Sequence, residues 1–467
     1  MKNSINPSNP YLTLAEVADA YRDGHLKPSD VVTAHLERIE RIDPRIGAWQ
    51  AVYADDALAA AHAADKALKN GYRIGPFHGI PFGLKDICDL QGKITTGGSM
   101  ALKDRISKVT GSLTRRLIVA GGIVLGKTKT VECAFGGWGT NQRMGTPWNP
   151  WDMQTHRVPG GSSAGSATAL AAGMALCAVG TDTGGSVRLP AAYCGLTGLK
   201  VTEGRLPTDG ILPLSHTLDT PGPMARTVED ATIMFSVMDG AEPWVTDRDR
   251  AAGTGLFAGL AQGVAGLRLA TLNEAERQAC DADTLSAYDQ ALELLRHLGA
   301  IIEPLTGARA YASMTADNGK LIAVEGYAHN GHLYDDLSLP MDEDVRPRML
   351  SGKSLSAVEY IRILQDRQEA KAQYYEAMHG FDAVLTPTMT SVAPPVAQID
   401  QQVSPGHFTR PFNYLGMCGL SLPSSLSADG IPHSLQILAR GNDEAICLRI
   451  GAAFEAARPR IPWPDLE

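Results

Sequence analysis

Two segments rich in glycine and serine stand out as places where chemistry could occur. They run from 159 to 166, PGGSSAGS, and from 180 to 188, GTDTGGSVR. Consecutive glycines let the backbone turn sharply and bring amide N–H groups to a bound atom. A serine that ends such a turn, as Ser186 does, is well placed as a nucleophile beside an oxyanion hole built from its own loop. Taken alone, each segment would be interpreted as an ordinary turn.

A lysine upstream of both segments could serve as the base. A serine hydroxyl is a weak nucleophile without an adjacent base, and neither segment contains histidine. Apolar residues alternate at 80, 82 and 84, which predicts a strand that carries Lys85. Burial between Phe82, Leu84 and Ile87 would disfavour the ammonium and lower its pKa from about 10.4. If this strand is considered alone, the alternative to a buried base is that Lys85 is an ordinary surface lysine beside Asp86.

Together, these segments resemble the signature of the amidase signature family. The block from 160 to 200, GGSSAGSATALAAGMALCAVGTDTGGSVRLPAAYCGLTGLK, is close to that signature almost throughout. GIPFGLKD, from 79 to 86, fits the lysine strand of the family. FDAVLTPT at 381–388 and the stretch from FTRPFN at 408–413 through Gln436 fit its C-terminal elements. Ala164 departs from the pattern, since the family usually has glycine there, and we expect a local backbone adjustment.

The resemblance covers roughly residues 12 to 460 and implies a role for each matching residue. Ser186 would be the nucleophile and Lys85 the base, with Ser162, joined to Gly161 by a cis peptide bond, as the bridging serine. The oxyanion hole would consist of the backbone N–H groups of Thr183, Gly184, Gly185 and Ser186. Three further residues would support the triad, namely Asp182 and Arg188 as braces of that loop and Ser163 through hydrogen bonds.

The same resemblance implies hydrolysis of a small-molecule carboxamide, or a related carbamate or hydrazide, without a metal or other cofactor. The alternative is the glutaminase (A) subunit of a tRNA-dependent amidotransferase. Those subunits typically have glutamine where this chain has Leu189, which favours a stand-alone hydrolase. The loop AFGGWGTN at 134–141 should line the acyl pocket. We therefore expect substrate contacts from Ala134, Phe135, Gly136 and Trp138, although the two aromatic side chains could instead pack the loop.

Helices and strands alternate along the chain in a way typical of an α/β fold. Helical patterns occupy the first sixty residues and the ranges 55–69, 110–120, 163–172, 281–298, 310–329, 354–379 and 443–457. Strands are expected at 79–87, 123–125, 176–179, 383–385 and near Leu420 and Leu435, and a loop at 242–266. We predict one large α/β/α body with a mixed, twisted central β-sheet covered by helices on both faces.

We further predict that residues 1–60 form a helical segment packed on an amidase signature domain at 61–460. Within that domain, the core motifs lie at 79–200, and a more variable region at about 240–380 would set the substrate choice.

Three other motifs are weaker. The sequence GGIVLGKT at 121–128 matches a P-loop, but its β-branched residues lie between the glycines, where the phosphate loop should be. Nucleotide binding is therefore a remote alternative. GSSAG at 161–165 matches a nucleophile elbow without the strand that should precede it. His329 and His332 could ligate a metal, but a solvated helix end explains them better.

Composition narrows the function classes. The chain has 48 glycines in 467 residues, a larger fraction than the usual ~7%. Its net charge of −9 makes it a poor electrostatic match for the phosphate backbone of nucleic acid. The seven cysteines are scattered, as free thiols in a reducing cytoplasm would be. The uncharged stretch from 158 to 181 is too rich in small residues to span a membrane. We expect a cytoplasmic enzyme that could form a homodimer, without nucleic-acid or membrane partners.

Overall fold

A single β-sheet of eleven strands runs through the molecule, which a computed structural model describes for residues 6–466. The strand order is β1-β3-β2-β4-β6-β5-β10-β11-β9-β7-β8. The strands are β1 Trp49–Val52, β2 Pro81–Lys85, β3 Ile123–Thr128, β4 Cys177–Asp182, β5 Thr197–Lys200, β6 Thr220–Ala225, β7 Arg268–Thr271, β8 Ile301–Pro304, β9 Ala383–Pro387, β10 Cys418–Leu426 and β11 Pro432–Ala439.

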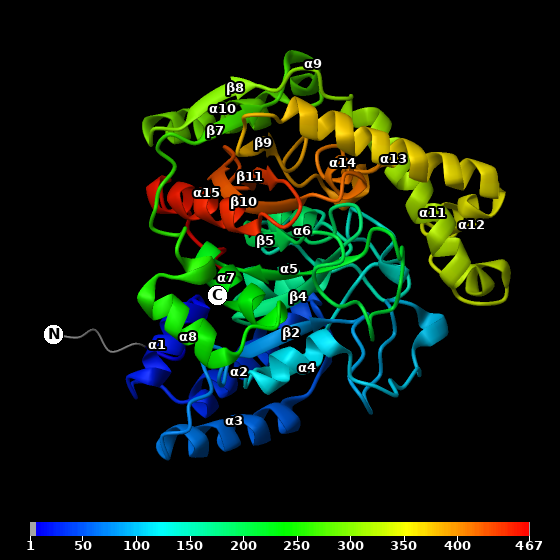
Figure 1. The fold of residues 1–467 in the computed structure, drawn as a ribbon. Helices are drawn as coiled ribbons and strands as arrows, with labels where there is room; N and C mark the ends of the chain where they lie inside the picture. The colour runs from blue at the N-terminus through cyan, green and yellow to red at the C-terminus, as the bar shows by residue number, and fades with distance from the viewer. Residues whose placement is uncertain (1–5, 467) are drawn as a thin grey trace.

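The helices lie around this sheet (Figure 1). They are α1 Leu14–Arg22, α2 Pro28–Ile46, α3 Ala54–Lys69, α4 Ser112–Val119, α5 Ala164–Ala171, α6 Arg188–Tyr193, α7 Val228–Met238, α8 Pro243–Ala252, α9 Glu274–Arg277, α10 Ala282–His297, α11 Tyr311–Asp335, α12 Arg346–Ser351, α13 Ala357–Ala377, α14 Arg410–Tyr414 and α15 Glu444–Ala457. Short 3-10 turns are η1 Met100–Leu102, η2 Glu132–Ala134, η3 Gly255–Phe257, η4 Gly352–Ser354 and η5 Val396–Gln398.

The sheet is mixed, as predicted. Strands β3, β2 and β4 are parallel to one another, and so are β9, β7 and β8. The pairs between β4 and β9 in the sheet order are antiparallel. Parallel pairing places the ends of β2 and β4 side by side, so Lys85 at the end of β2 lies close to the loop that follows β4.

Helices cover both faces of the sheet, which confirms the predicted α/β architecture. Successive side chains of a strand point to opposite faces. In β4, Val179 belongs to the large hydrophobic cluster that includes α7, whereas the preceding Ala178 belongs to a second cluster with α5. Helices α5 and α7 therefore pack on opposite sides of β4, and the strands that carry the candidate site are buried between them.

Two predictions of secondary structure were wrong. The first sixty residues are not helical throughout, because β1 pairs with β3 at the edge of the main sheet. The range 242–266 is not only loop, because it contains α8. Only Pro243 and Thr246 of α8 are buried, so this helix lacks the apolar periodicity that marks helices in a sequence. Its end signals are nevertheless present, with Pro243 in the first turn and Gly253 in a left-handed conformation after the last.

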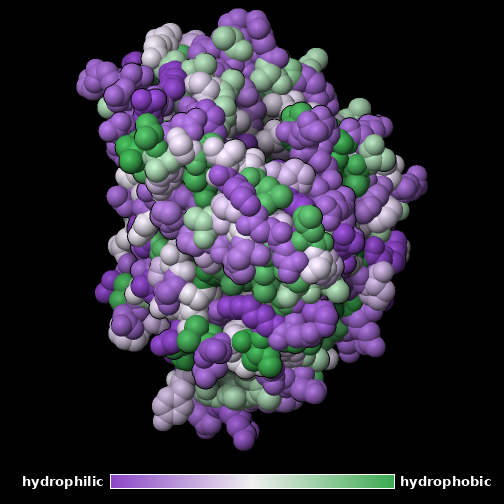
Figure 2. All heavy atoms as spheres, turned by 90° about the vertical axis from the view of Figure 1, so that its right-hand side faces the viewer, coloured by the Kyte–Doolittle hydropathy of each residue, from purple (hydrophilic) through white to green (hydrophobic). Residues whose placement is uncertain are grey.

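The surface is mixed in character. On the face that carries α11 and α12, hydrophobic residues are scattered among hydrophilic ones (Figure 2). In residues 6–466, none of the helices combines the length and the apolar character needed to cross a membrane. All seven cysteines are free thiols, as predicted.

Candidate active site

Lys85 lies at the end of β2 and is completely buried. Its Nζ donates hydrogen bonds to Ser162 Oγ at 2.8 Å and to Thr181 Oγ1 at 2.7 Å. Burial lowers the pKa of Lys85 to about 7, although the charges of Asp219 and Asp182 partly oppose this shift. The predicted burial and the predicted fall in pKa are both confirmed. A substantial fraction of these amines is therefore neutral at physiological pH and able to accept a proton.

Ser162 lies in the loop that precedes α5, and the structure brings its hydroxyl to Lys85. The peptide bond between Gly161 and Ser162 is cis, as the resemblance implied. The Ser162 carbonyl accepts hydrogen bonds from Thr130 Oγ1 at 2.9 Å and from the Val131 N–H at 3.2 Å. A Cβ on Gly161 would lie 2.5 Å from the carbonyl oxygen of Gly136, so only glycine allows these two loops to approach so closely.

Ser186 lies between β4 and α6 and is 8% exposed. Its carbonyl oxygen accepts hydrogen bonds from Ser163 Oγ at 2.6 Å and from the Ser163 N–H at 3.3 Å. Ser163 thus joins the two glycine-rich loops, and its role in support of the triad stays a prediction. The Ser186 hydroxyl makes no hydrogen bond to any residue within 6–466, Ser162 included. Catalytic hydrogen bonds are often long without substrate and tighten only when it binds.

Four amide N–H groups were expected in the oxyanion hole, and the structure separates one of them from the other three. The Gly185 N–H donates to Asp182 Oδ1 at 2.8 Å. The N–H groups of Thr183, Gly184 and Ser186 have no acceptor within residues 6–466. Three amide donors therefore remain for a developing negative charge. Gly185 itself has a φ of +123°, and a Cβ there would lie 2.3 Å from Thr409 Oγ1, so glycine is required.

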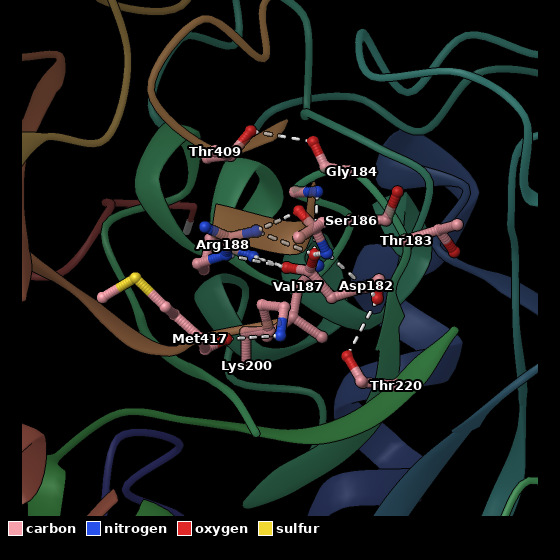
Figure 3. A network of polar contacts seen from close by, with 12 residues as sticks. Asp182, Thr183, Gly184, Ser186, Val187, Arg188, Lys200, Thr220, Thr409 and Met417 are labelled. Atoms are coloured by element: carbon pink, nitrogen blue, oxygen red, sulfur yellow. Dashed lines mark hydrogen bonds and ion pairs between the residues drawn. The ribbon is translucent and has the colours of Figure 1, made fainter. Parts of the chain in front are cut away.

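Asp182 and Arg188 form a buried ion pair that braces this loop (Figure 3). Arg188 Nε and Nη2 donate to the two carboxylate oxygens at 3.0 and 2.9 Å. Burial alone would raise the pKa of the Asp182 carboxyl, but the charge and hydrogen bonds of Arg188 hold it well below its usual value. Arg188 also donates to Gln436 at 2.8 Å and to Asn413 at 2.6 Å. C-terminal residues thus hold the loop in place.

The four residues expected to contact substrate divide between two cavities. Phe135, Gly136 and Trp138 line a cavity of about 160 Å³. Ala134 lines a much smaller one of about 10 Å³, together with Thr183. Trp138 also donates through its indole N–H to the Val403 carbonyl at 2.8 Å, so this side chain holds a neighbouring loop as well as lining the cavity.

Sequence reasoning missed several residues of the site. Asp219 accepts a hydrogen bond from Thr183 Oγ1 at 2.6 Å and contributes charge close to Lys85. Thr181 is the second hydroxyl on Lys85, and Thr409 donates to the Gly184 carbonyl at 2.8 Å. Thr181 lies inside the second glycine-rich segment. Its hydroxyl, near the end of a strand, could have been recognised from the sequence as a candidate site residue. Asp219 belongs to no local pattern that indicates this site. Thr409 lies in the FTRPFN stretch at 408–413, for which the resemblance implied no role in the site.

The weaker motifs have structural explanations. Residues 123–128 of the P-loop match form strand β3, and Lys127 is buried in it with Asp86 at 3.4 Å. His329 lies in helix α11 near His216, with ring centroids 5.5 Å apart. Across residues 6–466, no group of three or more His, Cys, Asp or Glu side chains could hold a metal ion.

Comparison with known proteins agrees with this fold. The model of the family described as Amidase matches residues 30–448. The chain therefore belongs to the amidase signature family and is an enzyme of the amidohydrolase class.

Individual relatives differ in activity. The 2-amino-5-chloromuconic acid deaminase of Comamonas testosteroni is 34% identical over 455 residues, which cover 96% of each chain. The A subunit of the glutamyl-tRNA(Gln) amidotransferase of Geobacter metallireducens is 33% identical over 477 residues, 96% of this chain and 97% of that one. The native peptide amidase of Stenotrophomonas maltophilia has a TM-score of 0.84 at 28% identity and covers 98% of this chain and 99% of its own.

Proposed function

We propose that this enzyme hydrolyses a small-molecule carboxamide, or a related carbamate or hydrazide, through an acyl-enzyme on Ser186. Ser162 relays protons between Ser186 and Lys85. The observation that carries the proposal is the buried Lys85, whose pKa is lowered to about 7 and whose Nζ lies 2.8 Å from Ser162 Oγ. A neutral amine beside a serine hydroxyl supplies the base that a serine nucleophile needs.

In the first half of the reaction, Ser186 Oγ attacks the carbonyl carbon of the amide. The Ser186 proton passes to Ser162 Oγ, and the proton of Ser162 passes to Lys85. The carbonyl oxygen becomes an oxyanion that accepts hydrogen bonds from the free N–H groups of Thr183, Gly184 and Ser186. The C–N bond then breaks, and the proton returns by the same route to the departing nitrogen, which leaves as ammonia or an amine.

In the second half, water attacks the ester formed on Ser186. Water gives up its proton through Ser162 to Lys85, and a second oxyanion forms at the same N–H groups. The ester bond to Ser186 Oγ breaks, the proton returns to that oxygen, and the carboxylic acid leaves. Because Lys85 is neutral again at the end, the proton balance of the cycle closes within these three side chains.

A substrate panel tests this proposal. Purified enzyme should release ammonia or amine from at least one of acetamide, benzamide, an aryl anilide, ethyl carbamate and a fatty amide. A fluorophosphonate should label Ser186 and abolish that activity. Absence of both turnover and labelling would contradict the proposal.

The second candidate is the glutaminase subunit of a tRNA-dependent amidotransferase. The 33% identity to one such protein over nearly the whole chain favours it. Leu189 supports the stand-alone hydrolase instead, because the A subunits typically have glutamine at this position. The Leu189 side chain is buried, and its Cδ1 would lie 3.0 Å from a Cβ built on Gly185 in the nucleophile loop. Ammonia release by the purified chain alone, with glutamine no better than other amides that carry a carboxylate, would support the hydrolase. Release that is specific for glutamine would support the glutaminase.

A further inference from the structure

The cavity of about 160 Å³ beside the candidate active site has a positively charged lining. The loops 135–138 and 401–405 form two of its walls, and helices α11, α12 and α14 contribute the rest. Two arginines, Arg348 and Arg410, line it, and neither aspartate nor glutamate does. A cavity with two cations and no anion in its wall is suited to a negatively charged ligand.

The two arginines differ in what they bind. Arg348 donates to the Phe135 carbonyl at 2.7 Å and to Gln401 Oε1 at 2.8 Å, so it holds the two loops together. The Arg410 guanidinium has no hydrogen bond and no ion pair with any residue within 6–466. Burial and the nearby charge of Arg348 lower the pKa of Arg410 to about 10, so it remains protonated at neutral pH. A half-buried cation without a partner is unfavourable unless a ligand supplies the missing anion.

A second polar side chain next to Arg410 also lacks partners. Asn318 of α11 is completely buried, and neither its Nδ2 nor its Oδ1 makes a hydrogen bond within the described residues. Buried polar atoms are nearly always hydrogen-bonded, so two orphaned atoms on one carboxamide call for an explanation. A ligand held by Arg410 would offer the carboxamide a partner.

Both side chains lie against the loop that leads to the nucleophile. A Cβ built on Gly184 would lie 3.2 Å from Cγ of Arg410 and 3.3 Å from Oδ1 of Asn318. Gly184 is two residues before Ser186. The adjacent Thr409 Oγ1 donates to the Gly184 carbonyl at 2.8 Å, as Figure 3 shows. A group bound by Arg410 would therefore belong to the same small molecule whose carbonyl reaches Ser186.

We propose that Arg410, assisted by Asn318, binds a carboxylate of the substrate, so that the preferred substrates are amides that carry a free carboxylate. This inference rests on the proposed amide hydrolysis. The planar guanidinium matches the two oxygens of a carboxylate, and such charge-assisted hydrogen bonds are about twice as strong as neutral ones. The Asn318 amide would add a donor to the same group. Arg348 keeps its contacts to the two loops and contributes charge.

Matched pairs of amides test this inference. Succinamate and butyramide have similar size and differ in the terminal carboxylate, and so do glutaramate and pentanamide. For at least one pair, kcat/KM of the unmodified enzyme should favour the anionic amide by about 10- to 100-fold, the range of a hydrogen bond to a charged group. Arg410→Leu should bring that ratio close to one, and Arg410→Lys should restore part of it. Arg296→Leu, which removes an exposed arginine from α10, should leave the ratio unchanged.

The outcomes separate this inference from the proposed function. Equal rates within both pairs, or a preference that survives in Arg410→Leu, would overturn the carboxylate site while leaving amide hydrolysis intact. No hydrolysis of any amide, together with no labelling of Ser186, would remove the proposed function itself. If Arg410→Leu does not fold, inhibition of the unmodified enzyme decides. Succinate should compete with butyramide, whereas the uncharged 1,4-butanediol should not, and equal effects of the two would contradict the inference.

Discussion

The amine of Lys85 lies 2.8 Å from the hydroxyl of Ser162 and makes no hydrogen bond to a carboxylate within residues 6–466. The buried Lys127 on the neighbouring strand differs, because the carboxylate of Asp86 lies 3.4 Å from its Nζ. A carboxylate partner favours the charged ammonium, whereas hydroxyl partners offset the cost of burial much less. This difference in partners gives Lys85, rather than Lys127, the environment of a base.

Replacement of Lys85 by alanine should lower kcat/KM for amide hydrolysis by about 10²- to 10⁴-fold, the usual contribution of a general base. In the unmodified enzyme, kcat/KM should fall as pH decreases through about 7, because protonated Lys85 cannot accept the serine proton. The Lys85→Ala variant should lack this inflection. Full activity of the variant at neutral pH would contradict the triad.

Burial of Lys85 should also affect how the free energy of unfolding depends on pH. The folded pKa of about 7 is below the ordinary 10.5, so between these values the unfolded chain binds a proton that the folded chain lacks. The free energy of unfolding should therefore rise with pH in this window, by at most about 1.4 kcal/mol per pH unit. Urea denaturation of Lys85→Met should lack this contribution. Parallel pH dependences for the two proteins would show that Lys85 has an ordinary pKa.

Replacement of Ser186 by alanine should abolish covalent labelling by a fluorophosphonate and reduce turnover by at least about 10³-fold, as loss of a nucleophile does. Intact-mass measurement reports the labelling directly. Ser338→Ala removes an exposed serine hydroxyl and should be labelled like the unmodified enzyme. A label that remains in Ser186→Ala would assign the nucleophile to another residue.

Asp219→Asn should shift the pH profile of kcat/KM to lower pH. The negative charge of Asp219 raises the pKa of Lys85, and asparagine removes that charge while its Oδ1 can still accept the hydrogen bond from Thr183. The control is Asp209→Asn, which removes an exposed carboxylate that binds Ser112. If the midpoint of the pH profile of Asp219→Asn were unchanged, the charge of Asp219 would have no effect on the pKa of Lys85.

Arg188→Met should destabilise the protein by about 3–5 kcal/mol, because it leaves the buried Asp182 carboxylate without its cation. Asp182→Asn combined with Arg188→Met should be less harmful than Arg188→Met alone, since no unpaired charge then remains. Chemical denaturation of Asp182→Asn, of Arg188→Met and of the double variant measures these effects. Additive effects of the two substitutions would show that the pair is not coupled.

Local patterns in the sequence predicted the elements with strong periodicity or clear ends. The expected helix at 281–298 corresponds to α10, Ala282–His297, and the expected strand at 176–179 to β4, Cys177–Asp182. Strand β1 was not predicted, because it has only four residues and pairs with an irregular register at the edge of the sheet. Such short elements depend on their neighbours, which a local pattern does not reveal.

The same distinction holds for the candidate site. The glycine-rich segments and the strand lysine indicated Ser162, Ser186 and Lys85, because the conformations of those loops depend on residues that are adjacent in the sequence. Asp219 and Arg410 come from distant segments and reach the site only through tertiary packing. Asp219 occurs in no recognisable pattern. Arg410 lies in the FTRPFN stretch at 408–413, but that stretch does not distinguish it from a surface charge, so only the folded chain indicates both positions.

The dependence of Arg188 on Asn413 and Gln436 has a consequence for the order of events during synthesis. Translation produces Ser186 and its loop more than two hundred residues before these two partners of Arg188 leave the ribosome. Strands β10 and β11, which contact helix α6 directly after the loop, are also completed later. A nascent or truncated chain that ends before residue 413 therefore contains all three triad residues without the C-terminal support of their loop. Hydrolytic competence should arise only after residue 436 has been synthesised.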